Sequence, residues 1–93
     1  MSATHFITQI AGARQRIDAL AQQESLDVYE QEAFGFIKDR LDQIRRECLS
    51  GNLTPKEERY GEMSRIVEES NPAHLPPDVG KELLDIEEDY QRM

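Results

Sequence analysis

The sequence has little of what would cross-link a protein, anchor it in a membrane or direct it to secretion. Its one cysteine, Cys48, has no second cysteine to pair with, so no disulfide can form within the chain. No apolar run approaches the roughly 18–20 residues that a membrane span requires. The N-terminal residues lack both the basic segment and the long apolar segment of a secretory signal peptide. These absences predict a soluble protein located in the cytoplasm.

Positive charge is also scarce. Lysine and arginine number 11 against 19 aspartate and glutamate residues, which gives a net charge of −8 on 93 residues. Proteins that bind nucleic acids or anionic membranes need a cationic surface, so we expect neither kind of partner. The one basic cluster, at residues 38–46, is interleaved with acidic residues, which disfavours a DNA-binding helix-turn-helix.

Patterns that carry catalysis or metal binding are missing as well. His5, His74 and Cys48 lie far apart, with no spacing typical of a zinc site. The five glycines are scattered and form no phosphate-binding loop. Cys48 stands near the end of a predicted helix, where the helix dipole does not lower the pKa of a thiol. The sequence therefore predicts a protein that is not an enzyme, with no catalytic residue, no cofactor and no metal site.

A helical pattern of apolar residues is present along the whole chain. Their spacing of three and four residues predicts helices at residues 4–23, 26–49, 54–70 and 77–91. The connections are short, which favours antiparallel neighbours. We therefore expect an all-α fold, a compact antiparallel bundle of about four helices, in a single helical domain over residues 1–93. The residues expected to face the core are Phe6, Ile10, Ala13, Ile17 and Leu20; Leu26, Ala33, Ile37, Leu41, Ile44 and Cys48; Tyr60, Met63, Ile66 and Val67; and Val79, Leu83, Ile86 and Tyr90.

Several helix ends carry sequence signals. Thr4 is predicted as the N-cap of the first helix, and Ser25 or Asp27 as that of the second. Gly51 follows the second helix, where a left-handed residue commonly ends a helix. The segment Thr54-Pro55-Lys56-Glu57 has a threonine cap, a proline in the first turn and a glutamate at the third position. This capping box predicts that the third helix starts at Thr54.

The acidic residues are concentrated in the second half of the chain. Residues 51–93 contain 11 acidic and 5 basic side chains, so they carry −6 of the net −8. In the last predicted helix, carboxylates with helical spacing form one stripe beside the apolar one, namely Asp78, Glu82, Asp85 and Asp89. The stripe is either a solvated face or a docking face for a basic protein, whose association it would accelerate.

Three apolar side chains are predicted outside the main core stripes. Leu84 lies on the outer side of the last helix if the apolar stripe of that helix faces the core. Tyr29 and Phe36 form a second stripe on the second helix, and they either widen the core or anchor a partner. The candidate partner-binding residues are therefore Asp78, Glu82, Asp85, Asp89, Leu84, Tyr29 and Phe36.

Several stretches of the sequence suggest a protein family. They are Ala13-x-x-Arg16, Leu41-Asp42-Gln43-Ile44-Arg45, Gly61, Glu68-Glu69-Ser70-Asn71-Pro72 and Leu84-Asp85-Ile86-Glu87-Glu88-Asp89-Tyr90. In these stretches, which extend over residues 13–90, the chain resembles the small all-helical immunity proteins that protect bacteria from their own type VI secretion effectors (Rhs and other polymorphic toxins). In particular, it is similar to those paired with toxins that hydrolyse NAD(P) and with related ADP-ribosyltransferase-like toxins.

The resemblance implies a function by binding. It implies a non-catalytic helical protein that binds a cognate toxin in the cytoplasm and blocks its active site, whose cleft we expect to be basic. The family offers no motif that would assign interface residues here, so the candidate residues come from charge and apolar geometry. Immunity proteins of colicin-type nucleases are also small, acidic and helical. Their tyrosine-rich third helix has no counterpart in this sequence, where Tyr60 stands alone in that segment.

Two other classes of function stay open. One is a non-catalytic adaptor or regulatory protein that acts through homo- or heterodimerisation, for example as a homodimer through the Tyr29 and Phe36 side. The other is a small enzyme or enzyme subunit, which a metal or cofactor retained in stoichiometric amount through purification would favour.

Overall fold

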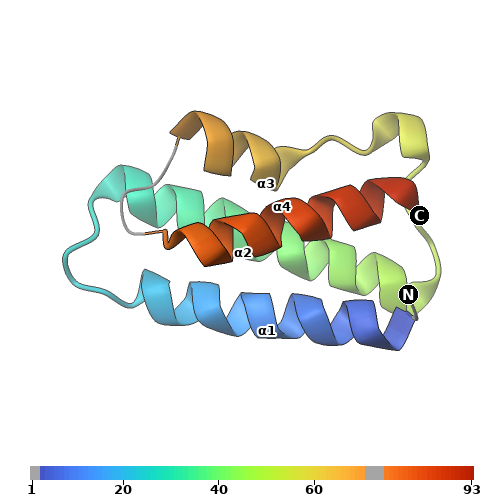
Figure 1. Cartoon of the computed structure of the whole chain (residues 1–93), viewed down its shortest axis with the longest axis horizontal. Coiled ribbons are helices and arrows are strands. Elements are labelled where there is room, and N and C mark those ends of the chain that lie inside the picture. The colour runs from blue at the N-terminus through green and yellow to red at the C-terminus, as the bar shows by residue number, and fades with distance from the viewer. Residues whose placement is uncertain (1–2, 71–74) are drawn as a thin grey trace.

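Successive helices run in opposite directions through the molecule (Figure 1). The computed structural model describes residues 3–70 and 75–93. In these residues the chain forms four α-helices, α1 (Ala3–Ala21), α2 (Val28–Ser50), α3 (Glu62–Arg65) and α4 (Pro77–Arg92). A 3₁₀ turn, Lys56–Glu58, precedes α3, and a π-helical turn, Ile66–Ser70, extends it. The predicted all-α bundle of four helices is therefore confirmed.

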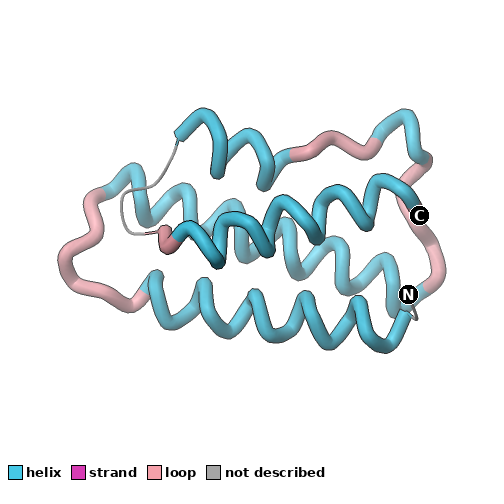
Figure 2. The backbone as a smooth tube through the Cα atoms, viewed as in Figure 1, coloured by secondary structure: helices cyan, strands magenta, loops and turns pink. Residues whose placement is uncertain are grey.

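Each helix packs against two neighbours, so the helices form a closed ring around the core. α1 packs on α2 and α4, and α3 packs on the same two helices. α2 and α4 consequently lie at opposite corners of the bundle, with α4 in front and α2 behind in the view of Figures 1 and 2. The flank between α1 and α4 faces away from the flank between α2 and α3. We call these the α1–α4 flank and the α2–α3 flank.

The core confirms most of the predicted apolar stripes. The buried hydrophobic residues are Phe6, Ile10, Ala13, Ile17, Leu26, Phe34, Ile37, Leu41, Ile44, Met63, Val79, Leu83, Ile86 and Tyr90. Leu20, Cys48, Ile66 and Val67 are partly buried and pack against this core. The prediction of Tyr60 as a core residue is wrong, because 66% of its surface is exposed. Phe34 was not expected in the core, where it takes the place predicted for the half-buried Ala33.

The ends of α2 confirm their predicted signals. The Asp27 carboxylate accepts a hydrogen bond from the Glu30 N–H at 2.8 Å, so Asp27 rather than Ser25 is the N-cap. Gly51 has a φ of 76°, and its N–H donates to the Glu47 carbonyl at 2.9 Å. The prediction of Thr4 as N-cap of α1 is wrong, since Ala3 is already helical.

The predicted start of the third helix at Thr54 is also wrong. The Thr54 N–H donates to the Glu47 carboxylate at 2.6 Å, and its carbonyl accepts a hydrogen bond from Arg59 Nε at 2.6 Å. With these backbone groups engaged, the chain makes only the short 3₁₀ turn and enters α3 after Gly61. A Cβ atom on Gly61 would lie 3.1 Å from Nε2 of the exposed Gln91 side chain, so α4 lies close to the start of α3 at this point.

The last helix agrees closely with its prediction. α4 begins at Pro77, because proline has no N–H to leave unsatisfied in a first turn and its fixed φ suits a helix. Its predicted apolar stripe is buried along its whole length. Pro72 and His74, which were predicted to lie in the preceding connection, fall outside the described residues.

Candidate functional site

The acidic stripe of α4 lies on the α1–α4 flank. Glu82 forms an ion pair with Arg16 of α1 at 2.5 Å, which fixes the direction of the stripe. Asp78 and Asp85 are exposed, and Asp89 is half-buried. These three carboxylates make no ion pair or hydrogen bond with any residue in the described ranges. Three of the four carboxylates are therefore available to a partner, whereas Glu82 is already paired.

An open depression lies on the same flank. It is lined by His5, Thr8 and Gln9 of α1 and by Asp78, Lys81, Glu82 and Asp85 of α4. Gln9 Oε1 is buried and accepts no hydrogen bond within the described part of the chain. Three carboxylates against one lysine leave this lining with an excess of negative charge, which favours a cationic donor such as a guanidinium or ammonium group.

Leu84 is half-buried and lies on the α3 side of α4, away from the acidic stripe. Gly80, one turn earlier, faces Val67, because a Cβ atom there would lie 3.4 Å from Val67 Cγ1. Gln91, two turns later, approaches Gly61. Residues four and seven positions apart share one side of a helix, so Leu84 shares this side. The structure does not bring Leu84 together with the carboxylates.

Tyr29 and Phe36 are exposed on α2, by 81% and 65% respectively. The alternative in which these rings widen the core is therefore wrong. Phe36 lines a second depression, on the α2–α3 flank, together with Asp39, Arg40, Asp42, Gln43 and Arg46 of α2 and Glu62 of α3. This flank faces away from the acidic stripe, so the seven candidate residues do not form one continuous surface.

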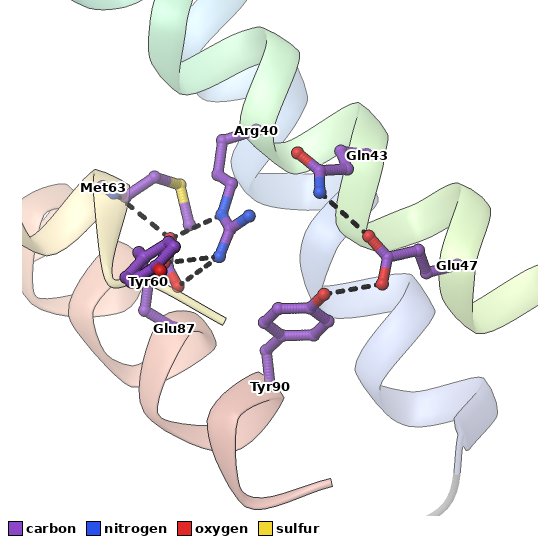
Figure 3. A network of polar contacts seen from close by, with 7 residues as sticks. All are labelled: Arg40, Gln43, Glu47, Tyr60, Met63, Glu87 and Tyr90. Carbon is purple, nitrogen blue, oxygen red and sulfur yellow. Dashed lines mark hydrogen bonds and ion pairs between the residues drawn. The ribbon is translucent and has the colours of Figure 1, made fainter. Parts of the chain in front are cut away.

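A buried ion pair joins α2 to α4 inside the bundle (Figure 3). Arg40 donates to the Glu87 carboxylate at 2.9 Å from Nε and 3.2 Å from Nη2, and the two side chains are only 5% and 1% exposed. Arg40 also donates to the Tyr60 carbonyl, and the Met63 N–H donates to Glu87. Burial disfavours the charged guanidinium, but the bonds and charge of Glu87 outweigh it and raise the pKa of Arg40. The pair thus holds the chain around α3 against α2 and α4.

The Arg40–Glu87 ion pair was not predicted from the sequence. Arg40 was grouped with the basic cluster on α2, and Glu87 stood within a run of three acidic residues. The sequence does indicate that both side chains border an apolar stripe of their helix. Arg40 follows Ile37 by three residues, and Glu87 follows Leu83 by four. That spacing indicates burial, but it does not identify a partner 47 residues away.

A second polar contact between α4 and α2, formed by Tyr90 and Glu47, lies beside the Arg40–Glu87 pair (Figure 3). The Tyr90 ring is fully buried, and the guanidinium carbons of Arg40 and Arg59 each lie 5.0 Å from its centroid. Its hydroxyl donates to Glu47 at 2.6 Å. Glu47 also accepts hydrogen bonds from the Gln43 side chain and from a backbone N–H. Partial burial disfavours the charged carboxylate, but these donors outweigh it and lower the pKa of Glu47 to about 2.

We expect stability to fall in acid through Glu47. Its folded pKa of about 2 lies below the ordinary value of 4.5, so the unfolded chain takes up the proton first as the pH falls. The contribution of Glu47 is complete above about pH 4.5 and is lost as the pH falls toward 2. Urea unfolding at a series of pH values measures this loss. The Glu47→Gln control should lose less stability across the same window, and equal losses in both proteins would contradict the assignment.

The described residues show no constellation typical of a reactive centre. No group of three or more His, Cys, Asp or Glu side chains in residues 3–70 and 75–93 is placed to hold a metal ion. Burial raises the pKa of the Cys48 thiol, and a protonated thiol is a poor nucleophile. Within the same ranges, no helix combines the length and the apolar character needed to cross a membrane.

The fold and its surfaces define a small all-α bundle with carboxylates on one flank and exposed aromatic rings on the opposite one. Comparisons of the chain with known protein families, with curated proteins and with solved structures found no match.

Proposed function

We propose that the protein is an immunity protein that binds a cognate secreted bacterial toxin domain in the cytoplasm and inhibits it by occluding its active site. The acidic stripe of α4 carries this proposal. Asp78, Asp85 and Asp89 are unpaired among the described residues, and the neighbouring depression adds further hydrogen-bond acceptors. The resemblance to immunity proteins of type VI secretion supports the same function. The alternative of a non-catalytic adaptor stays a prediction.

The chemistry of the expected toxin suits this surface. An enzyme that hydrolyses NAD(P) binds the phosphates of the dinucleotide, and arginine and lysine are the usual groups that pair with phosphate oxygens. The carboxylates from Asp78 to Asp89 are spread over about 16 Å of α4. A row of negative oxygens of this length can occupy a cationic cleft in place of the phosphates. Glu82 remains bound to Arg16 and keeps the row directed outward.

The test replaces Asp78, Asp85 and Asp89 together by lysine. Association with the cognate toxin domain should slow by about 10- to 1000-fold at low salt, because electrostatic steering is lost. Cells that co-express the toxin domain should lose their protection. Surface plasmon resonance measures the association rate, and growth of the co-expressing cells measures the protection.

A matched control makes the same change of charge elsewhere. Glu24, Glu57 and Glu58 are exposed, and their replacement by lysine changes the net charge equally while leaving the α1–α4 flank intact. This control should retain most of the association rate. Equal losses in the two triple variants would show that net charge alone matters. Unchanged binding by the first variant would exclude the stripe as the docking face.

A further inference from the structure

The outer side of α2 carries exposed aromatic rings beside unpaired charges of both signs. We call Tyr29, Phe36, Asp39 and Arg46 the α2 face. Phe36, Asp39 and Arg46 line one depression, and Tyr29 lies two turns before Phe36 on the same side of the helix. Asp39 and Arg46 are exposed and make no ion pair or hydrogen bond with other residues in the described part of the chain. The α2 face therefore has apolar surface and two opposite charges that the fold itself does not use.

These charges are arranged to complement a second copy of the same face. Asp39 precedes Arg46 by seven residues, about 10 Å along the helix axis. When two copies of α2 pair antiparallel about a two-fold axis between these positions, Asp39 of each copy meets Arg46 of the other. Every contact in such an interface occurs twice, so two ion pairs form. Phe36 then lies against the last turn of the other α2, which covers part of its exposed ring.

The distribution of charge favours self-association through α2 over self-association through α4. The chain carries a net charge of −8, so two copies repel one another. α4 contains six acidic and two basic residues, whereas α2 contains five acidic and four basic ones. α4 occupies the opposite corner of a bundle that extends 24 by 20 Å across its two shorter axes (Figure 1). That width is about two Debye lengths or more at physiological salt, so contact through α2 keeps the most acidic helices apart and screened.

We infer that two copies of the protein form a two-fold symmetric homodimer through the α2 face. The two α2 helices run antiparallel, Asp39 of each copy pairs with Arg46 of the other, and Phe36 lies in the contact. Both α1–α4 flanks remain on the outside of this dimer. With the proposed function, each flank binds one toxin domain, and the complex contains two copies of each protein. That stoichiometry rests on the proposed function, whereas the dimer does not.

Sedimentation equilibrium of the full chain tests the dimer directly. Because self-association depends on concentration, the average mass should rise from 10.7 kDa toward twice that value between about 1 µM and about 1 mM. Arg46→Glu and Asp39→Arg should each weaken the dimer by at least about tenfold, because each substitution places like charges opposite one another.

Mixing these two variants tests the symmetry of the contact. In the mixed dimer, Asp39 of the Arg46→Glu chain meets Arg46 of the Asp39→Arg chain, and the two introduced side chains pair as well. An equimolar mixture should therefore dimerise at least about tenfold more tightly than either variant alone. Arg45→Glu is the matched control, since Arg45 is exposed on the same helix but does not line the depression. Arg45→Glu should leave the dissociation constant of the dimer almost unchanged.

Three results would overturn the inference. They are a wild-type mass that stays at 10.7 kDa up to about 1 mM, a mixture no tighter than its components, and an Arg45→Glu chain weakened as much as Arg46→Glu. Far-UV circular dichroism checks that each variant keeps its helical content. Asp39→Asn and Arg46→Gln replace any variant that loses it, and they should weaken the dimer to a smaller degree. No toxin is used, so failure of the dimer and failure of toxin binding are distinguishable.

Discussion

Replacing Glu87 by alanine is expected to lower the free energy of unfolding by about 3–5 kcal/mol, the cost of leaving a buried charge without its partner. The Arg40 side chain is 5% exposed and would face the core with no carboxylate. The Met63 N–H would lose its acceptor as well. Single domains are stable by only about 5–15 kcal/mol, so this loss is a large fraction of the total. Urea unfolding followed by circular dichroism measures it.

Two comparisons isolate the buried charge as the cause. Arg40→Met combined with Glu87→Leu should cost much less than Glu87→Ala, because apolar side chains of similar volume need no partner. Glu88→Ala is the surface control, since Glu88 is exposed and its ion pair is with Arg92 one turn later. Its effect should stay within about 0.5 kcal/mol. A Glu87→Ala protein as stable as Glu88→Ala would contradict the role given to the buried pair.

Tyr90→Ala is expected to be comparably destabilising, by about 3–5 kcal/mol, because it removes a large buried ring. The ring is fully buried and lies 5.0 Å from the guanidinium carbons of both Arg40 and Arg59. Without it, both cations lose an aromatic face, and Glu47 loses one of its donors. Calorimetry of thermal unfolding measures the loss.

Tyr90→Phe separates the ring from its hydroxyl group. The ring and its cation–π contacts remain, so the loss should be about 1.5–3 kcal/mol, the value of one hydrogen bond to a charged group. The substitution should also raise the pKa of Glu47 toward 4.5, so less stability should be lost between about pH 4.5 and about pH 2 than in the wild type. Equal costs for Tyr90→Phe and Tyr90→Ala would show that packing of the ring is not what holds α4.

α4 shows how far local sequence reasoning reaches in this protein. Its apolar residues recur regularly, and a proline marks its first turn, so its position and its buried side could both be predicted. The ends of α2 could be predicted for a similar reason, since Asp27 and Gly51 act on backbone groups within four residues. These features depend only on neighbours along the chain.

The third helix shows where that reasoning fails. The capping box at Thr54 is a valid local signal, but Glu47 and Arg59 engage the backbone of Thr54 instead. Glu47 itself is held by Tyr90, 43 residues further along the chain. The tertiary contact overrides the local preference, because it gives a charged carboxylate additional donors. No pattern in the sequence could have indicated that Glu47 would have this partner.

The candidate partner-binding residues were likewise predictable only as far as local spacing reaches. The helical spacing of Asp78, Glu82, Asp85 and Asp89 placed them on one side of α4, and Glu82 and its neighbours do line one flank. The sequence could not show that Phe36 faces the opposite flank, because spacing fixes directions within one helix but not between two. The relative rotation of α2 and α4 is set by packing, and it separates the aromatic rings from the carboxylates.

The Arg40–Glu87 pair also has a consequence for the outside of the molecule. Turning an α-helix by one residue about its axis moves each side chain by about 100°. The observed rotational setting of α4 lets Glu87 meet Arg40 and, at the same time, turns Glu82 toward Arg16 of α1. The buried Arg40–Glu87 pair therefore helps to fix the direction in which the exposed carboxylates of α4 point. A substitution in the core that allowed α4 to rotate would redirect the charge of the surface without changing any surface residue.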